Sequence, residues 1–407
     1  MRERAIAGEA EWFTRARVTR FSLAAILSYC AGAIVVIATA RNGWDALGIP
    51  LGFDFLAFHG AARLAVDGQL ASAFDPQVFT AALERELPSV GYGYFWLYPP
   101  TFATILLPFG LLSYGIAFWI WTATGLSVYS ISAWTVTRNR VAVIACLGFT
   151  ATWVTAYHGQ NAFFSAALFI LAVHFLLGRK DRLAGMAIGL LAFKPHLAIL
   201  FPLALAAGGR WRAFVSAAAT AVLFSLASIA VFGWGYIDAF VEHGQSFAAA
   251  LLITERHWAT ITSVYVSASL AGLPPQLAWT LHALVAAAAA ALVLARFIAI
   301  GATRETLALL TAASLLISPY VMDYDLTVLA AAGLLLFATG EHPRHGMKWE
   351  QAAAFSVAMI PILIVGLGRL GLQIGWLAPV IVIVIAETRL RRLTPQAPKS
   401  RAALAAK

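Results

Sequence analysis

The chain has 407 residues, of which 61% are hydrophobic and 12% are charged. Soluble domains carry about 25% charged residues, and apolar runs long enough to cross a bilayer recur along this chain. The composition therefore predicts an all-α polytopic membrane protein and excludes a soluble one. The net charge of +9 does not indicate nucleic-acid binding, because the basic residues gather in short loops and at the chain ends.

The first apolar run, residues 21–40, is expected to remain as a membrane span, because it is too long for the core of a cleaved signal peptide. Basic residues favour the cytoplasmic side of a membrane, so the N-terminus is predicted to lie in the cytoplasm. The segment 41–112 is then the first loop on the outer, periplasmic face. The basic residues before the run are Arg2, Arg4, Arg15, Arg17 and Arg20.

Two helices are predicted in this outer loop, because apolar residues recur at helical spacing in 53–65 and 78–87. Asp75-Pro76 is a typical helix start for the second one. Both helices are expected to lie on the membrane surface. The apolar segment 99–112 is shorter than the ~20 residues of a spanning helix, so we expect it to be interfacial or re-entrant.

The rest of the chain alternates apolar runs with basic turns, which predicts about twelve crossings with both termini in the cytoplasm. The whole chain, 1–407, is expected to form one domain in the plasma (inner) membrane, with a second outer loop at 233–275 and a basic cytoplasmic tail at 388–407. The later crossings are expected at 114–136, 141–157, 162–177, 183–193, 196–207, 213–232, 276–298, 306–317, 324–338, 352–370 and 374–387.

This topology brings polar residues from distant parts of the chain to the outer membrane face. Ionisable residues at membrane depth are costly unless they are paired or face a water-filled cavity, so their convergence predicts a cavity at that face. The residues are Asp54, His59, Arg63, His158, Gly159, Gln160, Asn161, Lys194, His196, Glu255, Arg256, His257, Asp323 and Asp325.

Several short motifs occur in a fixed order along nearly the whole chain. They are Asp54 in the first outer loop, Asp75-Pro76, Tyr98-Pro99-Pro100, Gly159-Gln160-Asn161, Lys194-Pro195 and Ser318-Pro319-Tyr320. This order resembles that of glycosyltransferase family 87. The resemblance implies a GT-C-like helical bundle that moves a hexose, expected to be mannose, from a polyprenyl-phosphate sugar to an acceptor hydroxyl on the outer face, with inversion.

The resemblance also implies roles for individual residues. Asp54 matches the position of a general base, and Lys194 matches a lysine that contacts the donor phosphate. Arg256, His257 and His158 are further candidates for phosphate binding. The candidates for binding the rest of the substrates are His59, Arg63, Tyr98, Gln160, Asn161, Tyr320, Asp323, Tyr324 and Asp325.

One segment departs from the family pattern, in which a histidine often follows the Ser-Pro turn. Here residues 320–325 read Tyr-Val-Met-Asp-Tyr-Asp. No metal and no other cofactor is expected, because the spacing of His243 and His257 is not that of a metal site. The expected partners are the lipid-linked donor, an acceptor that is a lipid, a glycan or a protein, and membrane lipids.

Each candidate also has a purely structural interpretation. Asp54 could cap the helix that follows it, and Lys194 could extend from a helix end to the interface. Residues 158–161 could be only a tight turn, and Tyr98-Pro99-Pro100 only a rigid re-entry. Asp323 and Asp325 could cap a helix or pair with Arg256, and His59 and Arg63 could share a solvated helix face.

Two other functions are compatible with many spans and buried polar groups: a transporter or flippase for a lipid-linked intermediate, and a non-catalytic subunit of an envelope-assembly complex. Transporters tend to have internal repeats and interrupted helices that meet at the bilayer midplane. We find no repeat between the two halves, and the polar residues gather at one face, which favours the enzyme.

Overall fold

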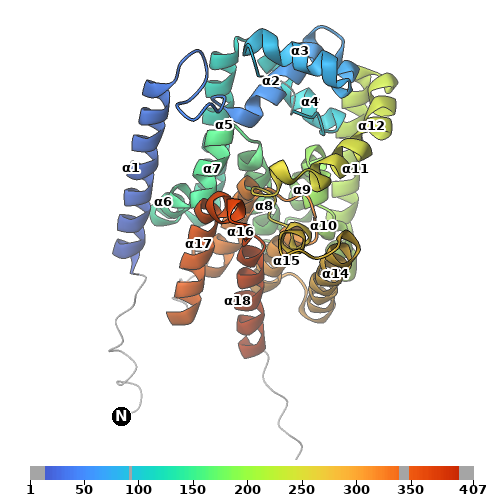
Figure 1. Cartoon of the computed structure of the whole chain (residues 1–407). Coiled ribbons are helices and arrows are strands. Elements are labelled where there is room, and N and C mark those ends of the chain that lie inside the picture. Colours follow the sequence, from blue (N-terminus) through green and yellow to red (C-terminus); the bar gives the residue numbers. More distant parts are fainter. Residues whose placement is uncertain (1–13, 91–93, 339–347, 394–407) are drawn as a thin grey trace, which may run out of the picture.

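The computed structural model describes residues 14–90, 94–338 and 348–393 (Figure 1). It is 80% helical, and no strand occurs in the described ranges. The predicted all-α class is therefore confirmed. The arrangement has two parts, a bundle of helices and a cap of short helices at one end of it (Figure 1, top).

Five of the described helices are long and apolar enough to cross a membrane, and α6 and α7 together would make a sixth. Those two helices are bent by 59° where Phe149 adopts an extended conformation. The prediction of about twelve crossings is therefore not confirmed. The five helices are α1 (Arg15–Thr39), α5 (Tyr114–Thr137), α11 (Trp211–Phe232), α14 (Pro275–Ile300) and α17 (Lys348–Arg369), and the bent pair is α6 (Arg140–Gly148) and α7 (Thr150–His158).

The remaining predicted crossings correspond to shorter helices inside the bundle. Twelve of the thirteen residues of α15 are buried, whereas α1 has no buried residue. A helix that is apolar on every side and packed in protein need not match the bilayer thickness, so these shorter helices do not by themselves support further spans. The short helices are α8 (Ala162–Leu177), α9 (Asp181–Leu190), α10 (Leu200–Ala207), α15 (Arg304–Leu316), α16 (Leu329–Gly333) and α18 (Leu377–Leu393).

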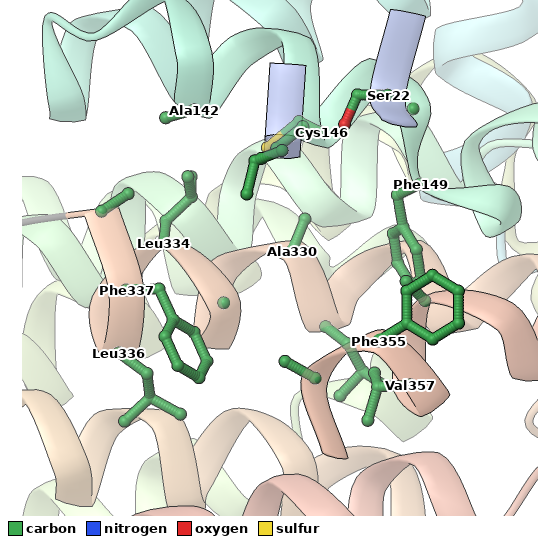
Figure 2. Close-up of a pocket in the computed structure, with 18 of the residues that line it drawn as sticks. Ser22, Ala142, Cys146, Phe149, Ala330, Leu334, Leu336, Phe337, Phe355 and Val357 are labelled. Atoms are coloured by element: carbon green, nitrogen blue, oxygen red, sulfur yellow. The ribbon is translucent and has the colours of Figure 1, made fainter. Parts of the chain in front are cut away.

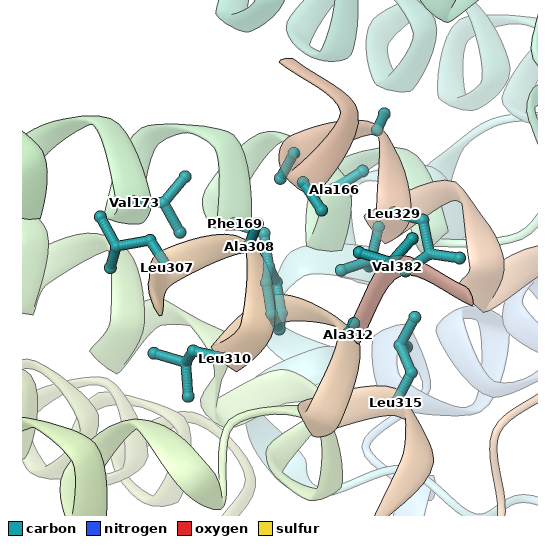
Figure 3. Close-up of a cluster of buried hydrophobic side chains, with 14 of the residues drawn as sticks. Ala166, Phe169, Val173, Leu307, Ala308, Leu310, Ala312, Leu315, Leu329 and Val382 are labelled. Atoms are coloured by element: carbon teal, nitrogen blue, oxygen red, sulfur yellow. The ribbon is translucent and has the colours of Figure 1, made fainter. Parts of the chain in front are cut away.

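Figure 3 shows how these inner helices form the main core. The labelled side chains include Phe169 of α8, Leu310 of α15, Leu329 of α16 and Val382 of α18, which all belong to one hydrophobic cluster. All four side chains are buried. Between α15 and α16 the chain forms the 3-10 helix η6 (Asp323–Val328), and α16 continues into the π-helical turn η7 (Leu334–Ala338).

The cap contains the helices that we predicted in the first outer loop. They are α2 (Phe53–Val66) and α3 (Pro76–Glu86), and the Asp75 side chain caps α3 as expected. Ten of the fourteen residues of α2 are buried, so α2 does not lie on the surface but forms the centre of the cap. The other elements of the cap are η1 (Leu70–Phe74), α4 (Pro100–Leu106) and η2 (Leu107–Leu111), the last two within the segment predicted not to span.

The predicted second outer loop is also helical. It contains α12 (Trp234–Ile253), η5 (Glu255–His257) and α13 (Val264–Leu270). Tyr236 of α12 accepts a hydrogen bond from Trp96 Nε1 at 2.6 Å and donates one to the carbonyl of Tyr98 at 2.6 Å. The two outer loops are thus joined directly.

The opposite end of the bundle is closed by ion pairs of basic residues. Arg389 is buried and pairs with Glu350 at 2.8 Å, which joins α18 to α17. Residues 388–393, which we assigned to the basic cytoplasmic tail, therefore continue the packed helix α18, where the buried Arg389 guanidinium has the partner that it needs. The rest of that predicted tail, 394–407, and the N-terminal Arg2 and Arg4 lie outside the described residues. The assignment of the cap to the outer side of the membrane, and of the opposite end of the bundle to the cytoplasmic side, stays a prediction.

Close helix packing in the bundle depends on two glycines of α9. A Cβ atom on Gly185 would lie 2.4 Å from the carbonyl oxygen of Ala213, and one on Gly189 would lie 2.5 Å from that of Ala217. Both carbonyls belong to α11. Small residues let the backbones of membrane helices approach closely, so these two positions do not accept a side chain.

We expect Gly189→Val to destabilise the protein by about 1–3 kcal/mol, because the added side chain meets a backbone that cannot move aside. The measurement is the melting temperature in detergent. Gly32→Val in α1 is the matched control, since nothing lies within 4 Å of a Cβ atom there. Equal melting temperatures for the two variants would contradict the packing argument.

Candidate active site

Asp54 lies in the first turn of α2, and its carboxylate is held by two side chains from the end of α7. Gln160 Nε2 donates to Asp54 Oδ2 at 2.9 Å, and His158 Nδ1 lies 3.0 Å from the same oxygen. A carboxylate only accepts hydrogen bonds, so His158 Nδ1 donates. Within the described ranges, Asp54 Oδ1 has no protein partner, and the side chain is 20% exposed.

Gly52, not Asp54, is the N-cap of α2, and no side chain caps that helix end. The structural interpretation of Asp54 as a cap is therefore wrong. A carboxylate in the first turn of a helix is still favoured by the helix dipole. Asp54 thus combines a fixed oxygen, Oδ2, with a second oxygen that is open to an incoming group.

The turn after α7 brings these partners into place. Gly159 has a left-handed conformation with φ of 66°, and its carbonyl accepts a hydrogen bond from Trp121 Nε1 at 2.9 Å. A Cβ atom on Gly159 would lie 2.6 Å from Phe55, so the position needs glycine. Gln160 Oε1 accepts hydrogen bonds from the Asn161 backbone at 3.1 Å and from the Tyr98 hydroxyl at 3.4 Å. Burial raises the pKa of the Tyr98 phenol, which keeps it protonated.

Lys194 lies between η3 (Leu191–Phe193) and η4 (Pro195–Leu197), and its side chain is only 4% exposed. Its Nζ donates to Asp325 Oδ1 at 2.6 Å and to Asn161 Oδ1 at 3.0 Å, and it lies 4.9 Å from the centre of the Tyr324 ring. Lys194 therefore does not extend to the interface. An ammonium group has three N–H donors, so one remains for a ligand.

Two buried polar atoms in this cluster, Asn161 Nδ2 and Asp323 Oδ2, have no hydrogen-bond partner among the residues that the structure describes. The other oxygen of Asp323 accepts from the backbone N–H of Tyr324 at 2.8 Å. Asp323 begins η6, outside the candidate spans, and burial raises the pKa of its carboxyl to about 6. Buried polar atoms usually find partners, so this donor and this acceptor are suited to a ligand.

The second outer loop reaches the cluster through backbone pairing. Thr262 N donates to the carbonyl of Val321 at 2.7 Å, and Asp323 N donates to that of Thr260 at 2.9 Å. This pairing fixes the start of η6 against residues 260–262, which follow η5 closely in the sequence. His257 of η5 is half-buried. The Arg256 side chain lies outside the described residues, and Asp325 pairs with Lys194.

Three predicted substrate-binding residues have their contacts elsewhere. His59 Nε2 lies 3.0 Å from the carbonyl of Leu112, and Arg63 donates to that of Gly110 at 3.0 Å. Both side chains also lie 3.7 Å from Glu86, so they join α2 to η2 and α3. His59 is fully buried, which also excludes the solvated-face interpretation for it. Tyr320 packs beside a separate apolar cluster around Ile261.

Two residues that support the site were missed at the sequence level. Thr155 Oγ1 lies 2.8 Å from Thr327 Oγ1 and donates to the carbonyl of Tyr324, which fixes η6 against α7. Trp121, which belongs to α5, donates a hydrogen bond to the carbonyl of Gly159. Both lie in apolar runs where nothing marks them in the sequence, since their role depends on a turn that is distant along the chain.

Two cavities, of about 340 Å³ and 250 Å³, lie away from these residues, the first between α1, α6 and α17, and the second between α9, α10 and α11. Neither is lined by Asp54 or Lys194. The water-filled cavity expected at the site stays a prediction. No group of three or more potential metal ligands occurs in the part of the chain that the structure describes.

These features define a helical membrane protein with a polar, partly buried site at one end of the bundle. The family model described as glycosyltransferase family 87 matches residues 96–319, which is more than half of the chain. The chain belongs to this family and is therefore a glycosyltransferase. The match includes residues 158–161 and Lys194, but Asp54 and residues 323–325 lie outside it. No curated protein and no solved structure matches the chain, so the GT-C-like fold stays a prediction.

We expect Lys194→Met to destabilise the protein by about 3–5 kcal/mol, because it leaves the buried Asp325 carboxylate without its partner. The double variant with Asp325→Asn should recover part of this loss. Melting temperatures in detergent for the single and double variants measure the coupling. Lys180→Met in the exposed turn before α9 is the control. Strictly additive effects of the two substitutions would contradict a direct ion pair.

Proposed function

We propose that this glycosyltransferase moves a hexose, and specifically mannose, from a polyprenyl-phosphate sugar to an acceptor hydroxyl. Family membership supports sugar transfer, and the helices of membrane-spanning length support a lipid-linked donor. One observation carries the proposal: Asp54 and Lys194 belong to a single hydrogen-bonded network through Gln160 and Asn161. Asp54 as the proton acceptor and Lys194 as the phosphate-binding residue can therefore act on the same pair of bound substrates.

In the proposed reaction, the acceptor hydroxyl attacks the anomeric carbon of the donor while Asp54 Oδ1 takes its proton. The bond from the anomeric carbon to the phosphate oxygen breaks, and the polyprenyl phosphate leaves with the electron pair. One displacement inverts the configuration at that carbon. A general base of this kind contributes typically 10²–10⁴-fold to the rate.

His158 and Gln160 orient the base in this scheme. Both donate to Oδ2, which restrains the carboxylate and leaves Oδ1 for the acceptor. Holding a catalytic group in the reactive geometry reduces the entropy lost in the transition state. Tyr98 completes the support, because its hydroxyl holds the amide oxygen of Gln160.

The leaving phosphate gains negative charge and needs donors aimed at it, which is usually the larger contribution to catalysis. The third N–H of Lys194 and the unpaired Asn161 Nδ2 are the donors that we assign to it. Asp325 keeps the ammonium in position. Asp323 Oδ2, the unpaired acceptor, is assigned to a hydroxyl group of the donor sugar, with Tyr324 beside it.

The site is proposed to face the outer side of the membrane, since the basic residues at the other end of the bundle favour the cytoplasm. An acceptor would reach Asp54 from the solvent side of the cap, where the carboxylate is exposed. A transporter is less well supported, because its polar site is expected at the bilayer midplane, whereas Asp54 belongs to the cap.

The test is an assay of the purified protein with polyprenyl-phosphate mannose and, separately, polyprenyl-phosphate glucose, together with a lipid extract as acceptor. Mass spectrometry follows the sugar-bearing product. We expect transfer from the mannose donor, and a fall in kcat of about 10²–10⁴-fold in Asp54→Asn, which removes the base. The melting temperature of Asp54→Asn should stay close to that of the wild type.

Asp67→Asn is the matched control, because this exposed aspartate lies at the other end of α2. It should retain full activity. If Asp54→Asn keeps wild-type transfer, Asp54 is not the base. If the wild type uses neither donor, or uses glucose alone, the mannosyltransferase assignment fails.

A further inference from the structure

The 340 Å³ cavity lies between α1, α6, η7 and α17 (Figure 2), and neither Asp54 nor any residue of α2 lines it. Most of its wall is hydrocarbon, including Phe149, Leu334 and Phe337, which point toward its centre in Figure 2. Its volume is within the range of small-molecule sites, about 300–1,000 Å³. It is separate from the site proposed for sugar transfer.

The polar groups of this cavity lie at one end of it, and the groups along the rest of it are mainly apolar. Arg15 begins α1, Asn139 caps the start of α6, and Gln351 lies in the first turn of α17. These three helix ends supply its polar rim, whereas the deeper wall is apolar apart from Ser22 and Cys146. Arg138 and Arg140, on either side of Asn139, are exposed. The rim is therefore cationic and the interior is apolar.

The depth of the cavity matches one leaflet of a bilayer. Arg15, Val18, Phe21, Ser22 and Ala25 line it from one face of α1. With a rise of 1.5 Å per residue, the distance from Arg15 to Ala25 is about 15 Å. The hydrocarbon core of a bilayer is ~30 Å thick, so a cavity of this length that begins at the membrane surface would reach about the midplane.

The cavity is also accessible from the lipid. Phe21 and Phe355 both line it, yet their side chains are 62% and 45% exposed. They come from α1 and α17, so the opening lies between these two helices. α1 packs closely against α6, where a Cβ atom on Gly148 would lie 2.6 Å from Ser22, but none of its residues is buried. A chain can therefore enter sideways from the membrane.

We propose that this cavity binds one acyl chain of an anionic diacyl phospholipid, whose phosphate group contacts Arg15 at the rim. Such a lipid requires a cation at the level of its headgroup and hydrocarbon below it. The cavity has a cationic rim and an apolar interior in that order. The bound lipid fills the space between α1 and the bundle and holds α1 in place. The π-helical turn η7 in its wall fits this role, because such turns are frequent at functional sites.

The test uses the full chain in nanodiscs with equal amounts of phosphatidylglycerol and phosphatidylcholine, and a small amount of polyprenyl phosphate. Native mass spectrometry identifies the lipid that stays bound when the protein is released. We expect one phosphatidylglycerol per chain. Ala25→Phe fills the inner part of the cavity and should lower retention about tenfold. This is the effect expected if the added ring displaces two methylene groups of the acyl chain from the cavity.

Arg15→Gln tests the rim without filling the cavity. It should lower the preference for phosphatidylglycerol about fivefold, the effect of one basic residue near an anionic surface. Ala24→Phe and Arg20→Gln are the controls, because both residues are exposed on α1 and do not line the cavity. Both controls should bind lipid as the wild type does, and melting temperatures verify that every variant is folded.

Four results would overturn the proposal. One is a wild-type protein that retains no lipid, and another is equal retention of phosphatidylcholine. The third is polyprenyl phosphate bound in place of phosphatidylglycerol, because the cavity would then hold the carrier lipid. Unchanged retention in both Ala25→Phe and Arg15→Gln would place the bound lipid elsewhere on the protein.

Discussion

The buried ion pair of Lys194 and Asp325 is the constraint on which the site depends. An ammonium group that is 4% exposed is stable only if its donors are satisfied. Asp325 and Asn161 supply two acceptors, and the Tyr324 ring lies within the range of a cation–π contact. Lys194 therefore fixes η6 against the start of α8, and through Asn161 it fixes the turn that ends α7.

The turn at 158–161 connects that ion pair to the cap. Gly159 allows the sharp change of direction, and the side chains on either side of it reach Asp54. A carboxylate on the cap and a cation in the bundle thereby form one polar network, although 140 positions separate Asp54 from Lys194 in the numbering. The unpaired atoms of Asn161 and Asp323 lie within this network, where a substrate can supply their partners.

Much of this arrangement could be predicted from the sequence. Apolar spacing located α2 and α3, Asp75-Pro76 marked the start of α3, and the length of 99–112 excluded a span. The resemblance selected Asp54, Lys194 and residues 158–161, which the structure brings together. The predicted number of spans is not confirmed, because apolar segments such as α8 and α15 form helices of only 16 and 13 residues that are largely buried in protein. Nor could the sequence tell that His59 and Arg389 have protein partners, since Leu112 and Glu350 are distant along the chain.

The most direct test of the account is a structure of the protein with a non-transferable analogue of a polyprenyl-phosphate sugar. The account predicts that a phosphate oxygen lies within hydrogen-bond distance of Lys194 Nζ. It also predicts that the anomeric carbon lies between that phosphate and Asp54 Oδ1, with room for an acceptor hydroxyl. An analogue bound away from both side chains, or one whose phosphate contacts only residues at the opposite end of the bundle, would contradict it.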